Sequence, residues 1–435
     1  MRTEAGTMIV HQSNDMCAPS DVSVVFGIVL VSASYALQLL GISMISSGCL
    51  VGGLTLLLLP AAFKMVSSNP HWRSSAVYFS LVGSIELLNL MNLREPMAFV
   101  VLVQRYICYA ICAAGMVYGQ RITDDSRRFP GIAHLAVAGF TCLVGGLWLR
   151  AAGSAGGIRF VGESDILTPV GVGYSFGILG CVSVAFLFNE QRLIFRAPHL
   201  IAYCICFLAI LSTGSRGSAV FLLLIAGAGV VVRLRSLNEG LRYSLVFLTI
   251  IVVLAVILAT NDYARSQLDF MLSRFAFISR GEIDLSIVER QQRRLFYYRS
   301  VDSWILLGLR GYNFKYPHNV FLESVLRFGV VGFGLIAAIL YSAVRAVKNL
   351  RVSQSGALVW VISSVGFFTL LVVQVNLMLE FARCLWLFVG YWGVKEVHNF
   401  RFGRLEHEER SADSESEGII SSFGELGSVK PLEEA

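Results

Sequence analysis

Long apolar runs limit what this chain can fold into more than any other feature of its sequence. Residues 243–260, "YSLVFLTIIVVLAVILAT", contain no charged side chain, and runs of similar character recur along most of the chain. A helix needs about 20 largely apolar residues in a row to cross the hydrocarbon core of a bilayer. Only 15% of the residues are charged, whereas soluble domains have about a quarter. The sequence therefore predicts an all-α, polytopic membrane protein.

The apolar runs predict about twelve membrane-spanning helices. We place them at 22–40, 44–63, 76–92, 97–118, 131–149, 168–187, 199–213, 217–232, 243–260, 328–345, 357–376 and 380–395. A short tail, 1–21, precedes them, and a large loop over 261–327 separates the first nine from the last three. The tail 396–435 is acidic and rich in Ser, Gly and Glu, a composition typical of disorder.

The charges of the connections predict the orientation. Every second connection is basic, and basic short loops belong in the cytoplasm, which places both termini there. The alternate connections are mostly short and poor in charge, but three of them carry arginine. One holds Arg216, the loop 150–167 holds Arg159, and the large loop has nine basic residues against six acidic ones over 261–318. These arginines on the outer side need an explanation other than topology.

Arg216 lies in the tight connection "LSTGSRGSAV" between two apolar runs. A guanidinium offers planar, paired donors that match phosphate oxygens, and it stays charged at physiological pH. Hydroxyls and backbone N–H groups near a helix start also favour anions. The turn therefore predicts a small anion cradle at the membrane surface. The alternative is that Arg216 only reaches toward lipid headgroups.

The stretch 308–332, "GLRGYNFKYPHNVFLESVLRFGVVG", carries the other candidate residues. His318 lies at the start of an amphipathic helix, beside an arginine-rich loop. An unperturbed histidine pKa of about 6.5 suits proton transfer at neutral pH, although a lone histidine is more often structural. Glu323 is expected to orient His318 or to hold a substrate hydroxyl, or else to be a solvated helix charge.

Arg105 and Glu86 are charged residues that fall inside predicted spans. Arg105 and Glu86 lie toward the outer ends of their helices, and we favour a structural pair between them, since charges at such depth are usually paired or line a polar cavity. The nine cysteines fall almost entirely inside apolar runs without a metal-ligand spacing. We interpret them as small buried apolar residues and predict no metal site.

The order of these motifs resembles that of the O-antigen ligase/polymerase superfamily, the WaaL-type ligases and Wzy-type polymerases of bacterial surface polysaccharide assembly. In that family an arginine and an amphipathic helix precede a "GxGxxxF" turn, an "HNxxL" motif and a pair of glycines. The matching residues here are Arg290, Gly308, Gly311, Phe314, His318, Asn319, Leu322, Gly329 and Gly332, with Arg159 and Gly162 in an earlier loop. The sequence departs from the pattern at Arg327, where an acidic residue is usual, at Arg310 inside the glycine turn, and at "LTPVG" in place of Pro-Asn.

The resemblance implies a metal-independent, inverting glycosyltransferase of the GT-C type in the bacterial inner membrane, with its active site facing the periplasm. Its donor would be an oligosaccharide on undecaprenyl diphosphate, its acceptor a glycan or a lipid A-core. Chain-length regulator and flippase proteins are expected partners besides membrane lipids, and no nucleic acid or cofactor is expected. The resemblance implies catalytic roles for His318, Arg216 and Arg290. We expect substrate contacts from Arg159, Ser215, Arg294, Tyr312, Asn319 and Glu323.

The sequence leaves the reaction open within the family. We favour a polymerase of exopolysaccharide or O-antigen repeat units over a ligase that moves the finished glycan to lipid A-core. A transporter or flippase of lipid-linked oligosaccharide would show inverted repeats and polar sites at mid-depth. The polar residues of this chain gather instead at the predicted outer face. A structural or sensor protein whose arginines bind anionic polymers without chemistry is a further alternative.

Overall fold

The computed structural model describes residues 19–67, 83, 99–120, 129–154, 169–190, 192–233, 237–279, 285–308, 319–352, 356–374 and 382–395. All regular structure in these ranges is helical. The chain divides into two compact units, Met1–Lys395 and Glu396–Ala435, and every described residue belongs to the first. The acidic tail predicted at 396–435 lies outside the described residues.

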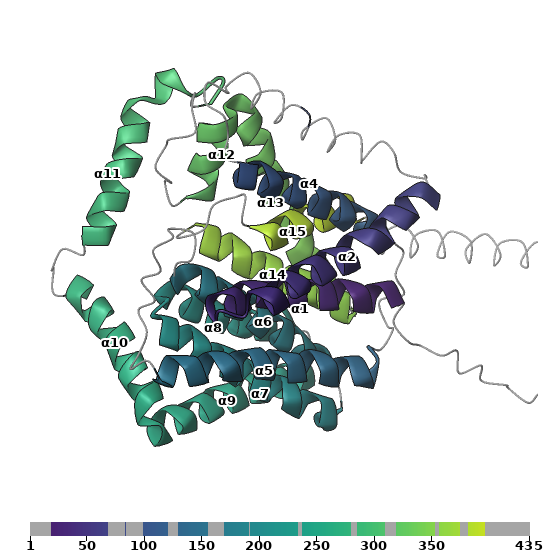
Figure 1. Ribbon diagram of the computed structural model, residues 1–435, viewed down its shortest axis with the longest axis vertical. Helices are drawn as coiled ribbons and strands as arrows, with labels where there is room; N and C mark the ends of the chain where they lie inside the picture. Colours follow the sequence, from purple (N-terminus) through teal and green to yellow (C-terminus); the bar gives the residue numbers. More distant parts are fainter. Residues whose placement is uncertain are drawn as a thin grey trace, which may run out of the picture. The chain divides into compact units, whose positions relative to one another are not determined.

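The described helices are arranged as a bundle, with α10 and α11 at one side of it (Figure 1). Their bounds are α1 Pro19–Leu39, α2 Ser43–Ser67, α4 Phe99–Gly119, α5 Gly131–Ser154, α6 Pro169–Asn189, α7 Leu193–Thr213, α8 Arg216–Arg233, α9 Leu237–Thr260, α10 Asp262–Ser279, α11 Leu285–Arg299, the 3₁₀ turn η1 Val301–Ser303, α12 Val320–Phe328, α13 Val330–Val352, α14 Ala357–Val373 and α15 Arg383–Val394.

Seven of the described helices are long and apolar enough to cross a membrane. The qualifying segments are Asp21–Leu39, Ser43–Phe63, Gly131–Gly153, Gly171–Asn189, Leu193–Thr213, Gly240–Thr260 and Val330–Leu350, and two shorter apolar helices cover Arg216–Val232 and Ala357–Val373. The prediction of an all-helical, multi-pass membrane protein is thus confirmed in its coarse form. Eleven of the twelve predicted ranges coincide with a described helix. The remaining range, 76–92, lies outside the described residues except for Gly83, so the number of spans stays a prediction.

Helix α6 lies inside the bundle and is buried along nearly its whole length, with α1, α7, α8 and α14 packed around it. Small residues allow this close approach, as is usual where helices pack within a membrane. A Cβ atom on Gly177 would lie 1.8 Å from the ring of Phe368 in α14. Helices α4 and α15 run parallel and equally close, because a Cβ on Gly115 or Gly390 would strike the backbone of the other helix.

Contacts along α6 show which helix ends lie together. Gly173 packs against Ser215 at the α7–α8 turn, Gly171 packs against Tyr35 near the end of α1, and the Tyr174 hydroxyl lies 3.4 Å from the Thr369 hydroxyl near the end of α14. We call this end of the bundle the Arg216 end. Helices α10 and α11 lie beyond the ends of the other helices in Figure 1.

Several helix bounds differ from the prediction by a few residues, and two of these differences involve charged segments. Helix α7 begins at Leu193, ahead of Pro198, instead of at 199. A proline near a helix start removes few hydrogen bonds, and the first turn is held because Arg196 Nε donates to the Glu190 carbonyl. Helix α5 continues to Ser154, so Arg150 is helical and not part of a loop. The large loop predicted over 261–327 contains α10, α11 and α12.

Candidate functional site

The α7–α8 turn places Arg216 as the first residue of α8, partly exposed at the end of an apolar helix. The preceding Gly214 has a φ of 68°, in the left-handed region that favours glycine, and its N–H donates to the Leu211 carbonyl. The Thr213 hydroxyl donates to the Ile210 carbonyl over 2.7 Å. The sequence "LSTGSR" therefore ends one helix and starts the next within two residues, Gly214 and Ser215.

The polar groups of this turn do not form the predicted cradle. The Ser215 N–H donates to the Thr213 hydroxyl over 3.2 Å, and the Ser215 hydroxyl, which is buried, donates to the Ser218 hydroxyl over 3.0 Å. The Arg216 N–H lies 3.0 Å from the Gly214 carbonyl. These donors bond within the turn because the turn packs tightly on Gly173, where a Cβ would lie 2.6 Å from Ser215. The Arg216 guanidinium is the charged group of this turn.

A second closely packed region is formed by α11, η1, α12 and the start of α13. Gly308, Gly329 and Gly332, which match the glycines of the family motifs, lie where its segments touch. Gly329 has a φ of 54°, and a Cβ there would lie 2.1 Å from the Leu306 carbonyl oxygen. A Cβ on Gly308 would lie 2.5 Å from the Arg327 carbonyl, and one on Gly332 would lie 2.2 Å from the Ser324 carbonyl. The segment after η1 thus lies directly on the α12–α13 junction.

A small apolar core fixes this structure. It consists of Tyr297, Trp304, Leu322, Val325 and Leu326. The Trp304 indole N–H donates to the Tyr297 carbonyl over 3.0 Å, so its polar edge is satisfied inside this core. The arrangement joins the arginine-bearing helix α11 to α12, the helix that follows His318.

Glu323 and Arg327 form a buried ion pair on α12. Arg327 Nε lies 2.9 Å from Glu323 Oε1, the Glu323 side chain is 0% exposed, and that of Arg327 is 8% exposed. The alternative that Glu323 is a solvated helix charge is therefore wrong. Asn319 caps the same helix, since its side-chain oxygen accepts from the Leu322 N–H over 2.9 Å.

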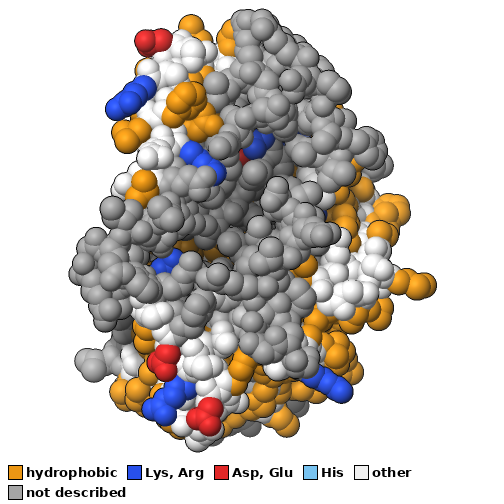
Figure 2. All heavy atoms as spheres, turned by 60° about the vertical axis from the view of Figure 1, so that its left-hand side comes forward, with side chains coloured by type: hydrophobic (Ala, Val, Ile, Leu, Met, Phe, Trp, Pro, Cys, Tyr) orange, Lys and Arg blue, Asp and Glu red, His pale blue; other side chains and the backbone are white. Residues whose placement is uncertain are grey.

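The remaining predicted site residues are only partly described. Arg294 lies half-buried on α11, and Arg290 lies on α11 with a side chain outside the described set. Arg159, Tyr312 and His318 lie outside the described residues, as does Glu86, the expected partner of Arg105. In Figure 2, which brings the α10–α11 side forward, Lys and Arg side chains lie at separate places, some beside a hollow.

A polar layer inside the bundle was missed by sequence reasoning. Arg383, the first residue of α15, donates from Nη2 to the Gln104 side-chain oxygen of α4 over 2.6 Å. Arg105, beside Gln104, is buried. Tyr174 and Thr369 place this layer at the Arg216 end of α6. The signal for Arg383 was a charge in an apolar run, as for Arg105, with Glu380 three residues before it.

Two buried histidines were also missed, and they lie at the opposite end of the bundle. His134 Nδ1 lies 3.1 Å from His199 Nε2, and His134 Nε2 lies 3.2 Å from a Glu190 carboxylate oxygen. The rings pack on Phe186. This cluster joins the start of α5, the end of α6 and the start of α7, far along α6 from Arg216.

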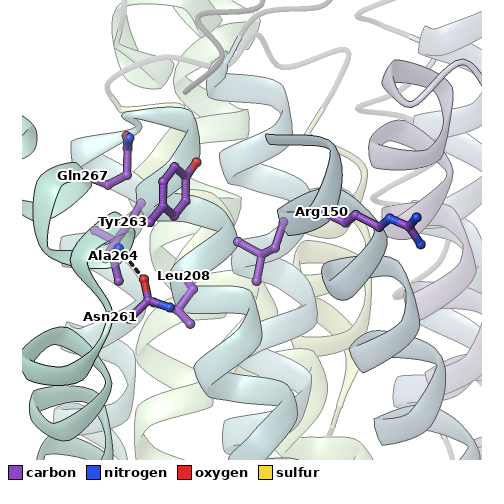
Figure 3. A pocket seen from close by; sticks show the side chains of 8 residues that line it. Arg150, Leu208, Asn261, Tyr263, Ala264 and Gln267 are labelled. Atoms are coloured by element: carbon purple, nitrogen blue, oxygen red, sulfur yellow. Dashed lines mark hydrogen bonds between the residues drawn. The ribbon is translucent and has the colours of Figure 1, made fainter. Parts of the chain in front are cut away.

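A pocket of about 290 Å³ lies between α10 and the ends of α5 and α7 (Figure 3). Tyr263 and Gln267 of α10 and Leu208 of α7 line it, whereas the Arg150 guanidinium extends away from Tyr263. Asn261 caps α10 by accepting from the Ala264 N–H over 2.9 Å. Burial raises the pKa of the Tyr263 hydroxyl above its ordinary value. The pocket is therefore lined by leucines of α5 and α7 together with Arg150 on one side, and by amide and hydroxyl groups at the start of α10 on the other.

Comparison with known proteins adds no family to this geometry. No family model matches the chain, and comparison with curated proteins and with solved structures gives no match either. Within the described ranges, no three His, Cys, Asp or Glu side chains lie close enough together to hold a metal ion. The features of the described residues that bear on function are the Arg216 guanidinium at the start of α8 and the close packing around Gly329.

Proposed function

We propose that this chain is a glycosyltransferase of the bacterial inner membrane that joins repeat units carried on undecaprenyl diphosphate. It would have a GT-C-type architecture, with the Arg216 end of the bundle facing the periplasm. The product would be a longer lipid-linked polysaccharide, such as an exopolysaccharide or an O-antigen.

The position of Arg216 carries this proposal. A partly exposed guanidinium begins a helix whose next seventeen residues are apolar or small except at its far end. The diphosphate of a lipid-borne donor lies at the same depth, because its polyprenyl chain stays within the hydrocarbon core. The close packing at Gly308, Gly329 and Gly332 supports the resemblance, since these motif positions have room only for glycine.

The reaction balances without a co-reactant. An acceptor hydroxyl attacks the anomeric carbon, the bond from that carbon to the phosphate oxygen breaks with inversion, and the lipid diphosphate leaves. His318 would take the hydroxyl proton. Negative charge grows on the leaving phosphate oxygen, and guanidinium groups held there in advance would stabilise it. Arg216 and Arg290 would have this role, with Arg159 as a further contact.

Substitution of Arg216 tests this role. Loss of one preorganised donor to a developing oxyanion typically lowers a rate about 10²–10³-fold, so we expect a loss of this size for Arg216→Ala. Arg216→Lys should recover little, because a lysine lacks the paired donors of a guanidinium. If Arg216 only reached toward headgroups, Arg216→Lys would keep wild-type activity. Arg265→Ala, an exposed arginine of α10, is the matched control.

The assay uses purified protein and undecaprenyl-diphosphate-linked repeat units. Longer lipid-linked chains, separated by gel electrophoresis, are expected from the wild type and from Arg265→Ala, and neither His318→Ala nor Arg216→Ala should produce them. Transfer only after lipid A-core is added would identify a ligase instead. Movement of the donor across vesicle membranes without any chain growth would contradict the proposal and favour a flippase.

A further inference from the structure

Helix α13 presents one exposed apolar face along most of its length. Its large exposed side chains follow the helical repeat, so that all of them lie on one side of the helix. They are Val330, Phe333, Leu340, Tyr341 and Val344. The same helix is long and apolar enough to cross a membrane over Val330–Leu350. This face is therefore the one that the span turns toward lipid.

The segment after η1 lies against the start of this face. The Val330 N–H donates to the Leu306 carbonyl over 3.0 Å, so the two residues lie at the same level. Gly329 permits this approach, since a Cβ there would lie 2.1 Å from the Leu306 carbonyl oxygen. The side chain of Leu306 is nevertheless 70% exposed, and that of Val330 is 58% exposed. Exposed apolar side chains thus continue from the span onto the segment after η1.

The small core around Trp304 extends further along the span. Ile336 of α13 packs against this core, and Tyr297 of α11 belongs to it. Because a helix rises about 1.5 Å per residue, Ile336 lies about 9 Å along α13 from Val330. The core, and with it the last turn of α11, therefore lies beside the first turns of the span.

The last turns of α11 expose apolar and aromatic side chains beside Tyr297. Phe296 is 66% exposed, and Leu295 and Tyr298 are exposed as well. The ring of Phe296 packs edge-on against that of Tyr297, with the centroids 5.5 Å apart, so it is held next to the core. Aromatic side chains are enriched where the hydrocarbon of a bilayer meets water. Arg299, exposed on the same helix, suits anionic lipid headgroups.

We propose that α11 and the segment after η1 dock on the bilayer surface, with Phe296 and Leu306 inserted where the headgroups meet the hydrocarbon. Helix α11 lies across the direction of α5 and α9, as a helix along a membrane surface would (Figure 1). The occupant of this surface is lipid and not a protein, because its side chains extend the exposed face of a membrane-spanning helix. The docking goes beyond the proposed glycosyl transfer, since it requires no reaction.

Spin labels on single introduced cysteines test this docking in lipid nanodiscs. Phe296→Cys and Leu306→Cys place a label on the proposed surface, and Leu340→Cys places one on the lipid-facing side of α13. Asp302→Cys, at an acidic position of η1, is the matched control that should face water. All four side chains are exposed, so these substitutions should leave the fold intact. Wild-type protein gives the background, since its described cysteines are buried or half-buried.

The measurement is the collision rate of each label with oxygen, which concentrates in the bilayer, and with a water-soluble nickel chelate. The labels at positions 296 and 306 should give a higher ratio of oxygen to nickel collisions than the label at position 302. Their ratio should approach the ratio at position 340 without reaching it, because the headgroup boundary is shallower than the middle of a span.

Two outcomes would overturn the docking. Nickel access at position 296 or 306 equal to that at position 302 would mean that the side chain faces water. Low collision rates with both reagents would mean that protein covers the surface, either a second copy of this chain or another partner. Because no sugar is transferred in this experiment, its failure would leave the proposed glycosyltransferase untouched, and inactivity of the enzyme would leave the docking standing.

Discussion

Charged side chains in this chain are held by two different kinds of partner. Glu323 and Arg327 neutralise each other on one face of α12, where both side chains are almost fully buried. Arg383 is instead tied to an uncharged amide 279 residues away in sequence. A buried pair offsets the desolvation of its own charges, but it leaves a large cost when one partner is removed. The two arrangements therefore respond differently to substitution.

The Glu323–Arg327 pair predicts strong coupling between its two residues. Glu323→Gln should destabilise the folded protein by about 3–5 kcal/mol, because it strands the Arg327 charge. Adding Arg327→Met should recover part of this loss, with a coupling free energy of about 1–3 kcal/mol. Thermal unfolding of the four proteins of the cycle measures it. Arg265 and Asp269, an exposed pair of the same spacing on α10, should show no measurable coupling.

Spacing along one helix could have predicted the Glu323–Arg327 ion pair but not the Arg383–Gln104 hydrogen bond. Residues four apart on a helix are neighbours, so the sequence "ESVLR" indicates an ion pair between Glu323 and Arg327 if this segment is helical. Arg327 was instead interpreted as a departure from a family motif. The Arg383–Gln104 bond depends on the parallel packing of α4 and α15, and no local pattern indicates that two helices so distant in sequence lie together.

At the scale of the element, glycines decide how α12 meets its neighbours. The backbone at Gly329 turns with a positive φ, and its N–H donates to the Val325 carbonyl over 2.8 Å. The N–H of Val330 donates to the Leu306 carbonyl over 3.0 Å, which ties the segment after η1 to the start of α13. The orientation of α12 follows from this junction.

Gly329→Ala should therefore open the junction. A side chain at this φ costs about 1–3 kcal/mol, and contact with the Leu306 carbonyl adds to that cost. We expect a lower unfolding temperature and faster proteolysis between α11 and α12. Gly139→Ala on α5, where a Cβ has nothing within 4 Å, should be neutral or stabilising. Equal behaviour of the two variants would show that the junction does not hold α12.

Apolar runs in the sequence predicted the positions of the long helices. They did not predict the helices whose sequences are rich in charge, because packing against other segments decides the structure there. The run that gives α9 is apolar along its length, so its helix needed no other information. Helices α10 and α11 were predicted only as part of a loop, because their sequences are rich in charge. The Trp304 core that anchors α11 to α12 joins residues from separate segments, and the sequence does not show which aromatic side chains meet.

For the whole molecule, the two ends of the bundle differ in chemistry. At the Arg216 end, arginines lie beside neutral hydroxyls and amides, as at Arg383. At the other end, Arg345 donates to the carbonyls of Trp392 and Gly393, and Lys395 donates to the Tyr391 hydroxyl over 2.9 Å. Cations at that end thus hold helix ends together.

This difference predicts which end faces outward, and single cysteines can test it. Ser266→Cys on α10 and Leu193→Cys at the start of α7 place exposed thiols at opposite ends. A membrane-impermeant maleimide should label Ser266→Cys in intact spheroplasts, whereas Leu193→Cys should require lysis. Wild-type protein gives the background, since most of its described cysteines are buried. The reverse pattern would turn Arg216 toward the cytoplasm. A diphosphate presented on the periplasmic surface could then not reach it, and the proposed glycosyl transfer would have no donor.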